Sequence, residues 1–319
     1  MVEGLAPSAP LLIVAVLSDG VFGDPQIRYH PVRLVGSALS LYERGLRGIG
    51  LSGYAGGCLL FLALSVTCVV LPASFIALVS TWSPSTGTAL HIGCLYFQLA
   101  LRDLVDHVLT VERFCRQEDL VAAQTAAARL VGRDTYDMDF AASRRAAIES
   151  LAENFVDGFL SPVAWYVVAG LPGILLFKVI STMDSMVGNK STKYVRFGWC
   201  GARLDDVFNY LPARLSWLLL SMSATFHRGL SAEKAFRFGL RQHSLVPGPN
   251  PGWPEATMAG LLQRKLIGPI WKDCVPVTSI WLGDAADPEG GKDGDVTRAI
   301  RAVITAALLA VGLALIALQ

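Results

Sequence analysis

The sequence predicts an all-α integral membrane protein whose reactive residues lie on the cytosolic side of the bilayer. The chain is 53% apolar and only 17% charged, whereas a soluble domain averages about 25% charged residues. The deficit is concentrated in residues 48–101, which contain no Lys, Arg, Asp or Glu. A soluble protein needs surface charge to stay solvated, whereas two membrane crossings of about 20 residues each would absorb this stretch.

We expect a single membrane-embedded catalytic domain, 1–319, with about four transmembrane helices, at residues 5–22, 54–80, 88–105 and 300–318. A basic loop containing Arg28 and Arg33 precedes the second of these helices, and further arginines follow the third. The positive-inside rule therefore places these flanks in the cytosol. The segments expected to be cytosolic are 24–53, 106–157, 184–214 and 227–298. The start of the chain has no basic n-region, so we expect no cleaved signal peptide.

Two apolar stretches do not fit a simple crossing. Residues 158–182 have basic residues on both sides and contain Pro162 and Pro172, so we expect a buried or re-entrant helical hairpin, since broken helices at membrane depth need protein around them. Folding it back would bring its two polar ends together. Residues 215–226 are too short for a span and predict a buried or interfacial helix. The acidic, glycine-rich segment 284–295 predicts a mobile loop.

The remaining bulk properties exclude other classes of protein. The net charge is +1, which gives no indication of a nucleic-acid partner. Six cysteines are scattered without a C-x-x-C pair, which is typical of packing residues in a reducing environment.

The densest polar stretch is 149–157. Glu149, Glu153 and Asp157 are spaced four residues apart, so a helix places all three on one face, with Asn154 beside them. Like charges on one face repel, so a cation, a basic segment or water should compensate. A solvated acidic face is the alternative, but an apolar run begins directly afterwards.

A second cluster follows the apolar hairpin, with Asp184, Ser185, Lys190 and Lys193. An acid at the end of a buried helix is a candidate functional residue, and the lysines could hold phosphate. The P-loop pattern is absent, so a nucleotide would be bound in another way. A basic loop with snorkelling lysines is the alternative.

Three further clusters complete the candidates. Asp205, Asp206 and Asn209 offer hard oxygen donors of the kind that Mg²⁺ prefers, although such pairs also cap helices. A proline-rich loop presents Asn250, Trp253 and Glu255 after His243, either as a rigid ligand surface or as a structural turn. In the first loop, His30 and Arg33 are candidates for contact with phosphate or carboxylate.

Together these clusters resemble one known family, the adenosylcobinamide-phosphate synthases, over about residues 10–270. The resemblance is carried by five ordered elements: Asp24-Pro25 with His30-Pro31-Val32 and 131–135; E-S-x-A-E-N-x-x-D-G at 149–158; T-M-D-S-M-V-G at 182–188; 202–206 with Asn209 and 212–214; and 250–260. One departure concerns the family's Ser-Pro-Asn-Ala-Gly-Trp-Pro loop. It reads Gly-Pro-Asn-Pro-Gly-Trp-Pro at 248–254 here, which puts the role of that loop in doubt.

The resemblance implies a ligase of the cell's cytoplasmic membrane that faces the cytosol. It would join adenosylcobyric acid to an amino-alcohol phosphate, such as 1-aminopropan-2-ol phosphate, using ATP and Mg²⁺, with the corrinoid as a substrate and not a prosthetic group. A homo-oligomer, or a complex with enzymes of later nucleotide-loop assembly, is left open.

The resemblance also implies roles for individual residues. Glu149 or Glu153 would act as the base, with Asp184 also catalytic, and Asp184, Asp205 and Asp206 would bind the metal. Substrate and phosphate contacts would come from the other residues of the clusters: His30, Arg33, Arg133, Asn154, Asp157, Ser185, Lys190, Lys193, Arg203, Asn209, Arg214, His243, Asn250, Trp253 and Glu255.

Two other classes of protein remain open from the sequence. Broken helices and intramembrane polar residues are also found in transporters, although no paired repeats occur here. A non-catalytic membrane sensor of the same fold is the second alternative, and the intact acidic clusters speak against it.

Overall fold

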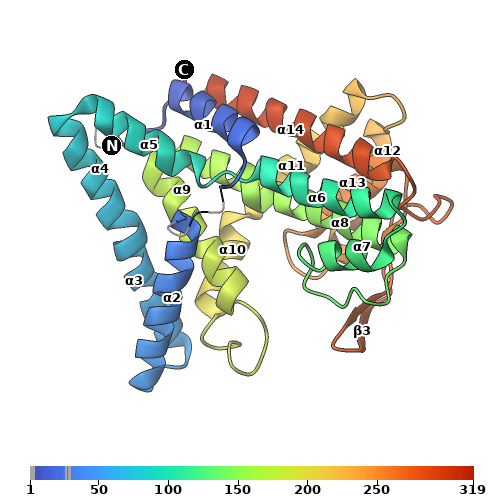
Figure 1. Ribbon diagram of the computed structural model, residues 1–319, viewed down its shortest axis with the longest axis horizontal. Coiled ribbons are helices and arrows are strands. Elements are labelled where there is room, and N and C mark those ends of the chain that lie inside the picture. The colour runs from blue at the N-terminus through green and yellow to red at the C-terminus, as the bar shows by residue number, and fades with distance from the viewer. Residues whose placement is uncertain (1–3, 26, 28–29) are drawn as a thin grey trace. The chain divides into compact units, whose positions relative to one another are not determined.

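The structure is a computed structural model that describes residues 4–25, 27 and 30–319, and it is almost entirely helical (Figure 1). The predicted all-α membrane fold is confirmed. Among the described residues, three helical runs are long and apolar enough to cross a bilayer, Tyr54–Trp82, Phe140–Val187 and Asp295–Ala317. Arg28 of the predicted basic loop lies outside the described residues.

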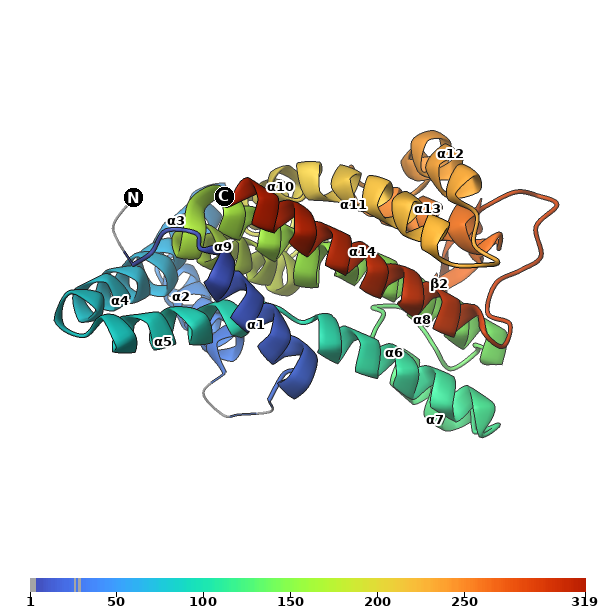
Figure 2. The same ribbon diagram turned by 90° about the horizontal axis from the view of Figure 1, so that it is seen from above.

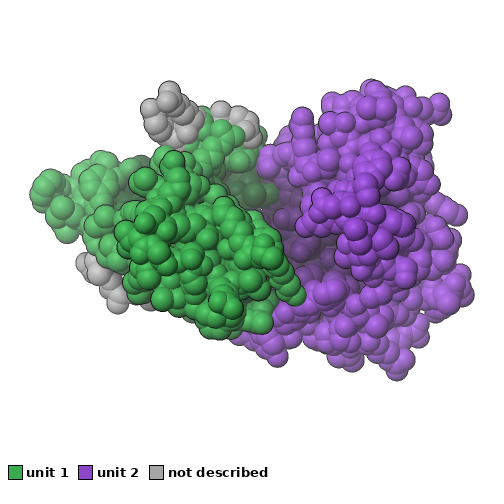
Figure 3. Space-filling view, turned by 90° about the horizontal axis from the view of Figure 1, so that it is seen from below, with its two compact units in different colours: residues 1–100, 161–209, 313–319 green, residues 101–160, 210–312 purple. Residues whose placement is uncertain are grey.

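The chain divides into two compact units, coloured separately in Figure 3. Unit 1 comprises residues 1–100, 161–209 and 313–319, and unit 2 comprises residues 101–160 and 210–312. The helices of unit 1 are α1 (Ala9–Phe22), α2 (Pro31–Gly48), α3 (Tyr54–Ser65), η1 (Val66–Val70), α4 (Leu71–Trp82), α5 (Pro84–Tyr96), α9 (Ser161–Val187) and α10 (Trp199–Phe208).

Unit 2 contains most of the remaining helices and all four short strands. Its helices are α6 (Leu101–Arg116), α7 (Leu120–Ala127), α8 (Phe140–Phe155), η2 (Val156–Leu160), α11 (Tyr210–Ser223), η3 (Ala224–Phe226), α12 (Ala232–Gln242), η4 (His243–Leu245), α13 (Gly252–Leu262) and most of α14 (Asp295–Ala317). Its strands are β1 (Leu266–Ile267), β2 (Ile270–Lys272), β3 (Val275–Thr278) and β4 (Trp281–Leu282).

The helix bounds agree with the predicted spans at 54–80 and 300–318 and differ elsewhere. The first predicted span is α1, whose 14 residues are fewer than the roughly 20 that a crossing needs. The third predicted span, 88–105, is not one helix, because α5 ends at Tyr96 and α6 begins at Leu101. Tight turns separate the two helices, with the backbone N–H of Leu99 donating to the carbonyl of Tyr96 (3.1 Å).

The run from Phe140 to Val187 joins α8, the π-helical turn η2 and α9. Both π-turns, η1 and η2, directly precede a proline at the second residue of the next helix, Pro72 and Pro162. Proline lacks the N–H that closes an ordinary α-helical turn, which accounts for the local change in hydrogen bonding.

The predicted break in 158–182 lies at Gly170, whose backbone is non-helical with φ 63°. A side chain here would meet the carbonyl oxygen of Leu5 at 2.2 Å, and the same carbonyl accepts a hydrogen bond from the N–H of Leu171 (3.0 Å). The polar backbone freed by the break is therefore satisfied within unit 1. Whether this element re-enters or crosses the bilayer stays a prediction.

In unit 2, α11, α12 and α13 lie side by side (Figure 2), and so do α6, α7 and α8 (Figure 1). Every residue of α13 is buried, which makes it the central helix of this unit. Helix starts are set by side-chain caps: Asp119, Asp139 and Ser231 each accept a hydrogen bond from a backbone N–H of the first turn. Such caps are worth about 1 kcal/mol each.

Two small antiparallel sheets follow α13 and were not predicted. Strand β1 pairs with β4 through Leu266 and Leu282, and β2 pairs with β3 in a hairpin. Ile267 in β1 has φ 68°, an unfavourable conformation for a β-branched residue. A contact of its backbone therefore has to hold it in place.

Candidate functional site

Glu149 is the anchoring carboxylate of unit 2. Its Oε2 accepts a hydrogen bond from the Arg133 guanidinium (2.6 Å), and its Oε1 accepts one from the backbone N–H of Ile267 (2.7 Å). The side chains of Glu149 and Arg133 are 8% and 11% exposed, so this ion pair is shielded from water. The contact with Ile267 explains how the strained backbone of β1 is held. Both oxygens of Glu149 are thus already used.

Glu255, in the first turn of α13, is buried close to the acids of α8. The residue is 7% exposed, and its Oε2 has no hydrogen-bond partner in the described part of the chain. Burial raises the pKa of Glu255 well above its ordinary value, and the charges of Glu153 and Glu149 raise it further, while Arg133 lowers it. Glu153 itself is exposed. The cluster therefore runs from an exposed carboxylate to a buried carboxyl group whose surroundings favour its protonated form.

The proline-rich loop is packed around the indole of Trp253. The imidazole of His243 stacks on this indole with centroids 3.9 Å apart and planes 17° apart, and the Arg214 guanidinium lies 4.9 Å from the indole centroid. Arg214 also donates to Oδ1 of Asn250 (3.4 Å). Four predicted binding residues of unit 2 thus lie together around the indole of Trp253: Arg214, His243, Asn250 and Trp253 itself.

Asn154 and Asp157 continue the helix face of Glu149 and Glu153. The amide of Asn154 donates to the carbonyl (3.0 Å) and hydroxyl (3.1 Å) oxygens of Ser150, so it is fixed one turn back along α8. Asp157 lies in the π-turn η2, half-buried. Isolated π-turns occur frequently at functional sites, which agrees with the prediction for this stretch.

In unit 1, Asp184 lies near the end of α9, where Gly188 leaves room for it. A Cβ at Gly188 would stand 2.0 Å from Oδ1 of Asp184 and 2.6 Å from its carbonyl oxygen. The backbone N–H of Gly188 donates to that carbonyl (2.8 Å). Only glycine therefore fits this position of the 182–188 motif without displacing the carboxylate. Ser185 beside it is exposed.

The acids of α10 are held by neighbouring side chains. Oδ2 of Asp205 accepts from the Asn209 amide (3.0 Å), and Oδ1 of Asn209 accepts from the Ser161 hydroxyl at the start of α9 (2.5 Å). Arg203 pairs with Asp206 (3.0 Å) at the surface. Arg203 and Asn209 thus position carboxylates, which does not test their predicted role toward a substrate.

The other predicted phosphate contacts are exposed or already paired. Lys190 is exposed, and Lys193 pairs with Glu43 (3.4 Å). In the first loop, His30 is buried and pairs with Oδ1 of Asp24 (2.7 Å), while Arg33 is exposed on α2. His30 therefore serves the loop's own structure through Asp24, and its contact with phosphate stays a prediction.

A metal centre of three acids is not formed by the protein alone. No group of three or more His, Cys, Asp or Glu could hold a metal ion within residues 4–25, 27 and 30–319. Mg²⁺ bound to nucleotide phosphates needs only one or two carboxylates, and the half-buried Asp184 and Asp206, whose side chain is 33% exposed, are candidates for that smaller set. The predicted meeting of the hairpin's two ends stays a prediction.

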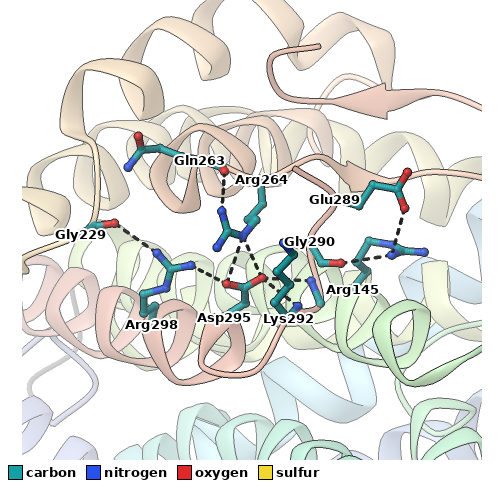
Figure 4. Close-up of polar contacts among 10 residues, drawn as sticks. Arg145, Gly229, Gln263, Arg264, Glu289, Gly290, Lys292, Asp295 and Arg298 are labelled. Atoms are coloured by element: carbon teal, nitrogen blue, oxygen red, sulfur yellow. Dashed lines mark hydrogen bonds and ion pairs between the residues drawn. The ribbon is translucent and has the colours of Figure 1, made fainter. Parts of the chain in front are cut away.

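Sequence reasoning missed a buried aspartate in the segment expected to be a mobile loop. Asp295, at the start of α14, is fully buried and accepts hydrogen bonds from two arginines, Arg264 and Arg298, and from the N–H groups of Gly291 and Lys292 (Figure 4). An aspartate directly before a long apolar helix is typical of a helix start, a signal that could have identified it. Of its partners, Arg264 is 31 residues away, whereas the other three lie three or four residues from Asp295.

The fold and the two groups of carboxylates, one in each unit, define the class of this protein: an all-α membrane protein with acids gathered on its helices. The acids are Glu149, Glu153 and Glu255 in unit 2 and Asp184, Asp205 and Asp206 in unit 1. A family model described as CobD/Cbib protein matches residues 12–303, so the chain belongs to the CobD/CbiB family. The cobalamin biosynthesis protein CobD of Rhizobium meliloti (strain 1021) is 41% identical over 287 residues, covering 86% of each chain. The cobalamin biosynthesis protein CbiB of Salmonella typhi is 37% identical over 304 residues, covering 94% of each chain. No solved structure matches the chain.

Proposed function

We propose that the chain is an ATP-dependent amide ligase of cobalamin biosynthesis, an enzyme of the cytoplasmic membrane with its active site facing the cytosol. It joins adenosylcobyric acid to an amino-alcohol phosphate, such as 1-aminopropan-2-ol phosphate, to give adenosylcobinamide phosphate. Two findings support this proposal: the family match over 12–303, and relatives named as cobalamin biosynthesis proteins. The specific reaction is inferred from the five motifs that resemble those of the synthases.

The observation that carries the proposal is the acid cluster of Glu149, Glu153 and Glu255. Amide formation from a carboxylate and an amine requires an activated acyl group and an amine that has lost its proton. A carboxylate near the amine can take that proton as a general base, and it does so best when its pKa lies near the working pH. The buried Glu255 has a raised pKa beside the exposed Glu153, and both oxygens of Glu149 are occupied. We therefore assign Glu149 to positioning and the proton transfer to the other two.

The acids and lysines of unit 1 suit the nucleotide. Asp184 and Asp206 would hold the Mg²⁺ of ATP, which supplies neutralisation of the phosphate charge when bound. Lys190, at the surface, would contact a phosphate directly as a point charge. Lys193 is held by Glu43 (3.4 Å) and would have to leave it to do the same.

The test uses the purified full chain in detergent micelles or nanodiscs, supplied with ATP, Mg²⁺ and the two substrates. We expect ATP to be consumed only when both substrates are present, and mass spectrometry to find the corrinoid joined to the amino-alcohol phosphate through an amide. Glu153→Gln should abolish product, whereas Glu233→Gln, at a side chain that is 86% exposed, should not. Substrate movement across the membrane without a new covalent bond would support a transporter instead.

A further inference from the structure

The buried end of the acid cluster contains a polar atom without a hydrogen-bond partner in the described residues. Oε2 of Glu255 has no hydrogen-bond donor within the described ranges, although the residue is 7% exposed and its helix is buried throughout. A buried acceptor without a partner destabilises the folded state. Such an atom in a native fold indicates either a role or a group that binds there.

The charges around Glu255 show which kind of group fits. Of the groups that act on it, Glu153 and Glu149 are negative and Arg133 is positive, and Arg133 is hydrogen bonded to Glu149. The cluster thus holds two more acids than it has bases, so it favours a cation.

The cations on the other elements packed against α13 point elsewhere. On α11, α12, η4 and the residue preceding β1, several basic groups already have partners. Arg214 and His243 lie against Trp253, Lys234 pairs with Asp287 (2.6 Å), and Lys265 pairs with Glu289 (3.6 Å). None of these basic groups is among those that act on Glu255.

A metal ion held by protein groups alone is not indicated here, since no group of three or more His, Cys, Asp or Glu in the described residues is arranged to bind one. Unlike Asp184 and Asp206, this cluster is not assigned to a nucleotide phosphate that would complete a metal site. A primary ammonium is the alternative: it carries one charge and three N–H donors, and two carboxylates and a few other acceptors suffice to bind it.

We propose that Glu255 and Glu153 together bind the ammonium group of the amine substrate, and that Glu255 gives up its own proton to solvent when the ammonium binds. This inference rests on the proposed function. It assigns the recognition of the amine to unit 2 and makes one residue serve both for binding and as the base.

The proton balance of the reaction agrees with this assignment. At rest Glu255 is protonated, and binding of R–NH₃⁺ releases that proton and leaves a carboxylate against the ammonium. Glu255 then takes one N–H proton, and the free amine attacks the acyl phosphate formed from the corrinoid carboxylate and ATP. The C–N bond forms, the acyl C–O bond breaks, and phosphate leaves with the second amine proton as hydrogen phosphate. Glu255 is again protonated, and one proton has been released per turnover.

The experiment measures proton release on binding, without ATP, by isothermal titration calorimetry of the full chain in two buffers of different ionisation enthalpy at pH 7. The ligands are 1-aminopropan-2-ol phosphate and propane-1,2-diol 2-phosphate, in which a hydroxyl replaces the ammonium. We expect release of about one proton per amine bound and none with the hydroxyl compound. The amine should bind about tenfold to a hundredfold more tightly, as expected for charge-assisted hydrogen bonds.

The variant Glu255→Gln should lose the proton release and bind the two compounds about equally, while Glu233→Gln should behave as the wild type. The comparison of ligands on the wild-type chain decides the matter even if Glu255→Gln fails to fold. Equal binding of the two compounds by the wild type, or amine binding without proton release, would overturn this inference while product formation left the proposed function standing. Absence of amide product would instead refute the proposed function.

Discussion

The ion pair between Arg133 and Glu149 gives the sharpest prediction about the architecture of the site. Its side chains are 11% and 8% exposed and its N–O distance is 2.6 Å. Unit charges 2.6 Å apart attract by about 6 kcal/mol at an effective dielectric constant of about 20. Removing one partner leaves the other charge buried, which costs about 3–5 kcal/mol. Either Arg133→Met or Glu149→Gln should therefore lower the free energy of unfolding by that amount.

A double-mutant cycle isolates the pair itself. Glutamine at 149 keeps an acceptor for the N–H of Ile267, so the cycle leaves the strained β1 backbone supported. Because the double variant no longer buries a lone charge, it should lose less stability than either single variant and much less than the sum of both. Denaturant unfolding in detergent micelles, followed by circular dichroism, gives the three values.

The exposed pair of Arg203 and Asp206 is the control. Its side chains are 65% and 33% exposed, and an exposed pair contributes about 0–1 kcal/mol, so Arg203→Met should have little effect. If the two changes at Arg133 and Glu149 add up within experimental error, or cost no more than Arg203→Met, the pair does not hold the site together and the reasoning is refuted.

Three further predictions concern particular side chains. Gly188→Ala should abolish turnover, since its Cβ would displace the neighbouring aspartate carboxylate, whereas Gly45→Ala, which meets nothing within 4 Å in α2, should leave turnover unchanged; comparable loss from both would contradict this. Asp295→Asn should lower the free energy of unfolding by about 3–5 kcal/mol, because it leaves two arginines without a buried partner. Asp293→Asn, at a side chain that is 75% exposed, should lower it by less than about 1 kcal/mol. Thermal melts that rank the two variants in the other order would contradict this role of Asp295. Because the folded-state pKa of Glu255 is raised, the folded chain binds more protons than the unfolded one above about pH 4.5 and loses stability as pH rises toward that pKa. The stability of Glu255→Gln relative to wild type should therefore increase between pH 5 and pH 8. A constant difference in stability would refute the raised pKa.

The membrane fold could be predicted because its signal is local. The charge-free stretch 48–101 predicted the helix run 54–82, and the apolar end of the chain predicted α14. The third predicted span was wrong in its bounds, because the turns at 97–100 divide it without any proline or glycine that would mark them.

The site could be predicted only as separate motifs. The spacing of Glu149 and Glu153 placed both on one helix face, which the structure keeps within α8. The partners of Glu149 could not be predicted, because Ile267 is 118 residues away and its donor is a backbone N–H in a short strand. The same limit applies to Glu255. Its motif suggested a binding residue, but its closeness to the acids of α8 depends on the packing of α13.

The loop at 284–295 is a second case in which the sequence could not predict contacts with distant residues. Glycines and acids in a row predicted mobility, yet Asp287, Glu289 and Asp295 pair with basic residues from other segments. Composition alone does not reveal long-range ion pairs, since each of them depends on where the chain returns.

The most direct test of the central claim is mass spectrometry of the purified chain after incubation with adenosylcobyric acid, 1-aminopropan-2-ol phosphate, ATP and Mg²⁺. The account predicts a corrinoid whose mass has grown by the amino-alcohol phosphate less one water, formed together with ADP and lost in Glu153→Gln. An unchanged corrinoid mass in the presence of folded wild-type protein and all four components would contradict it.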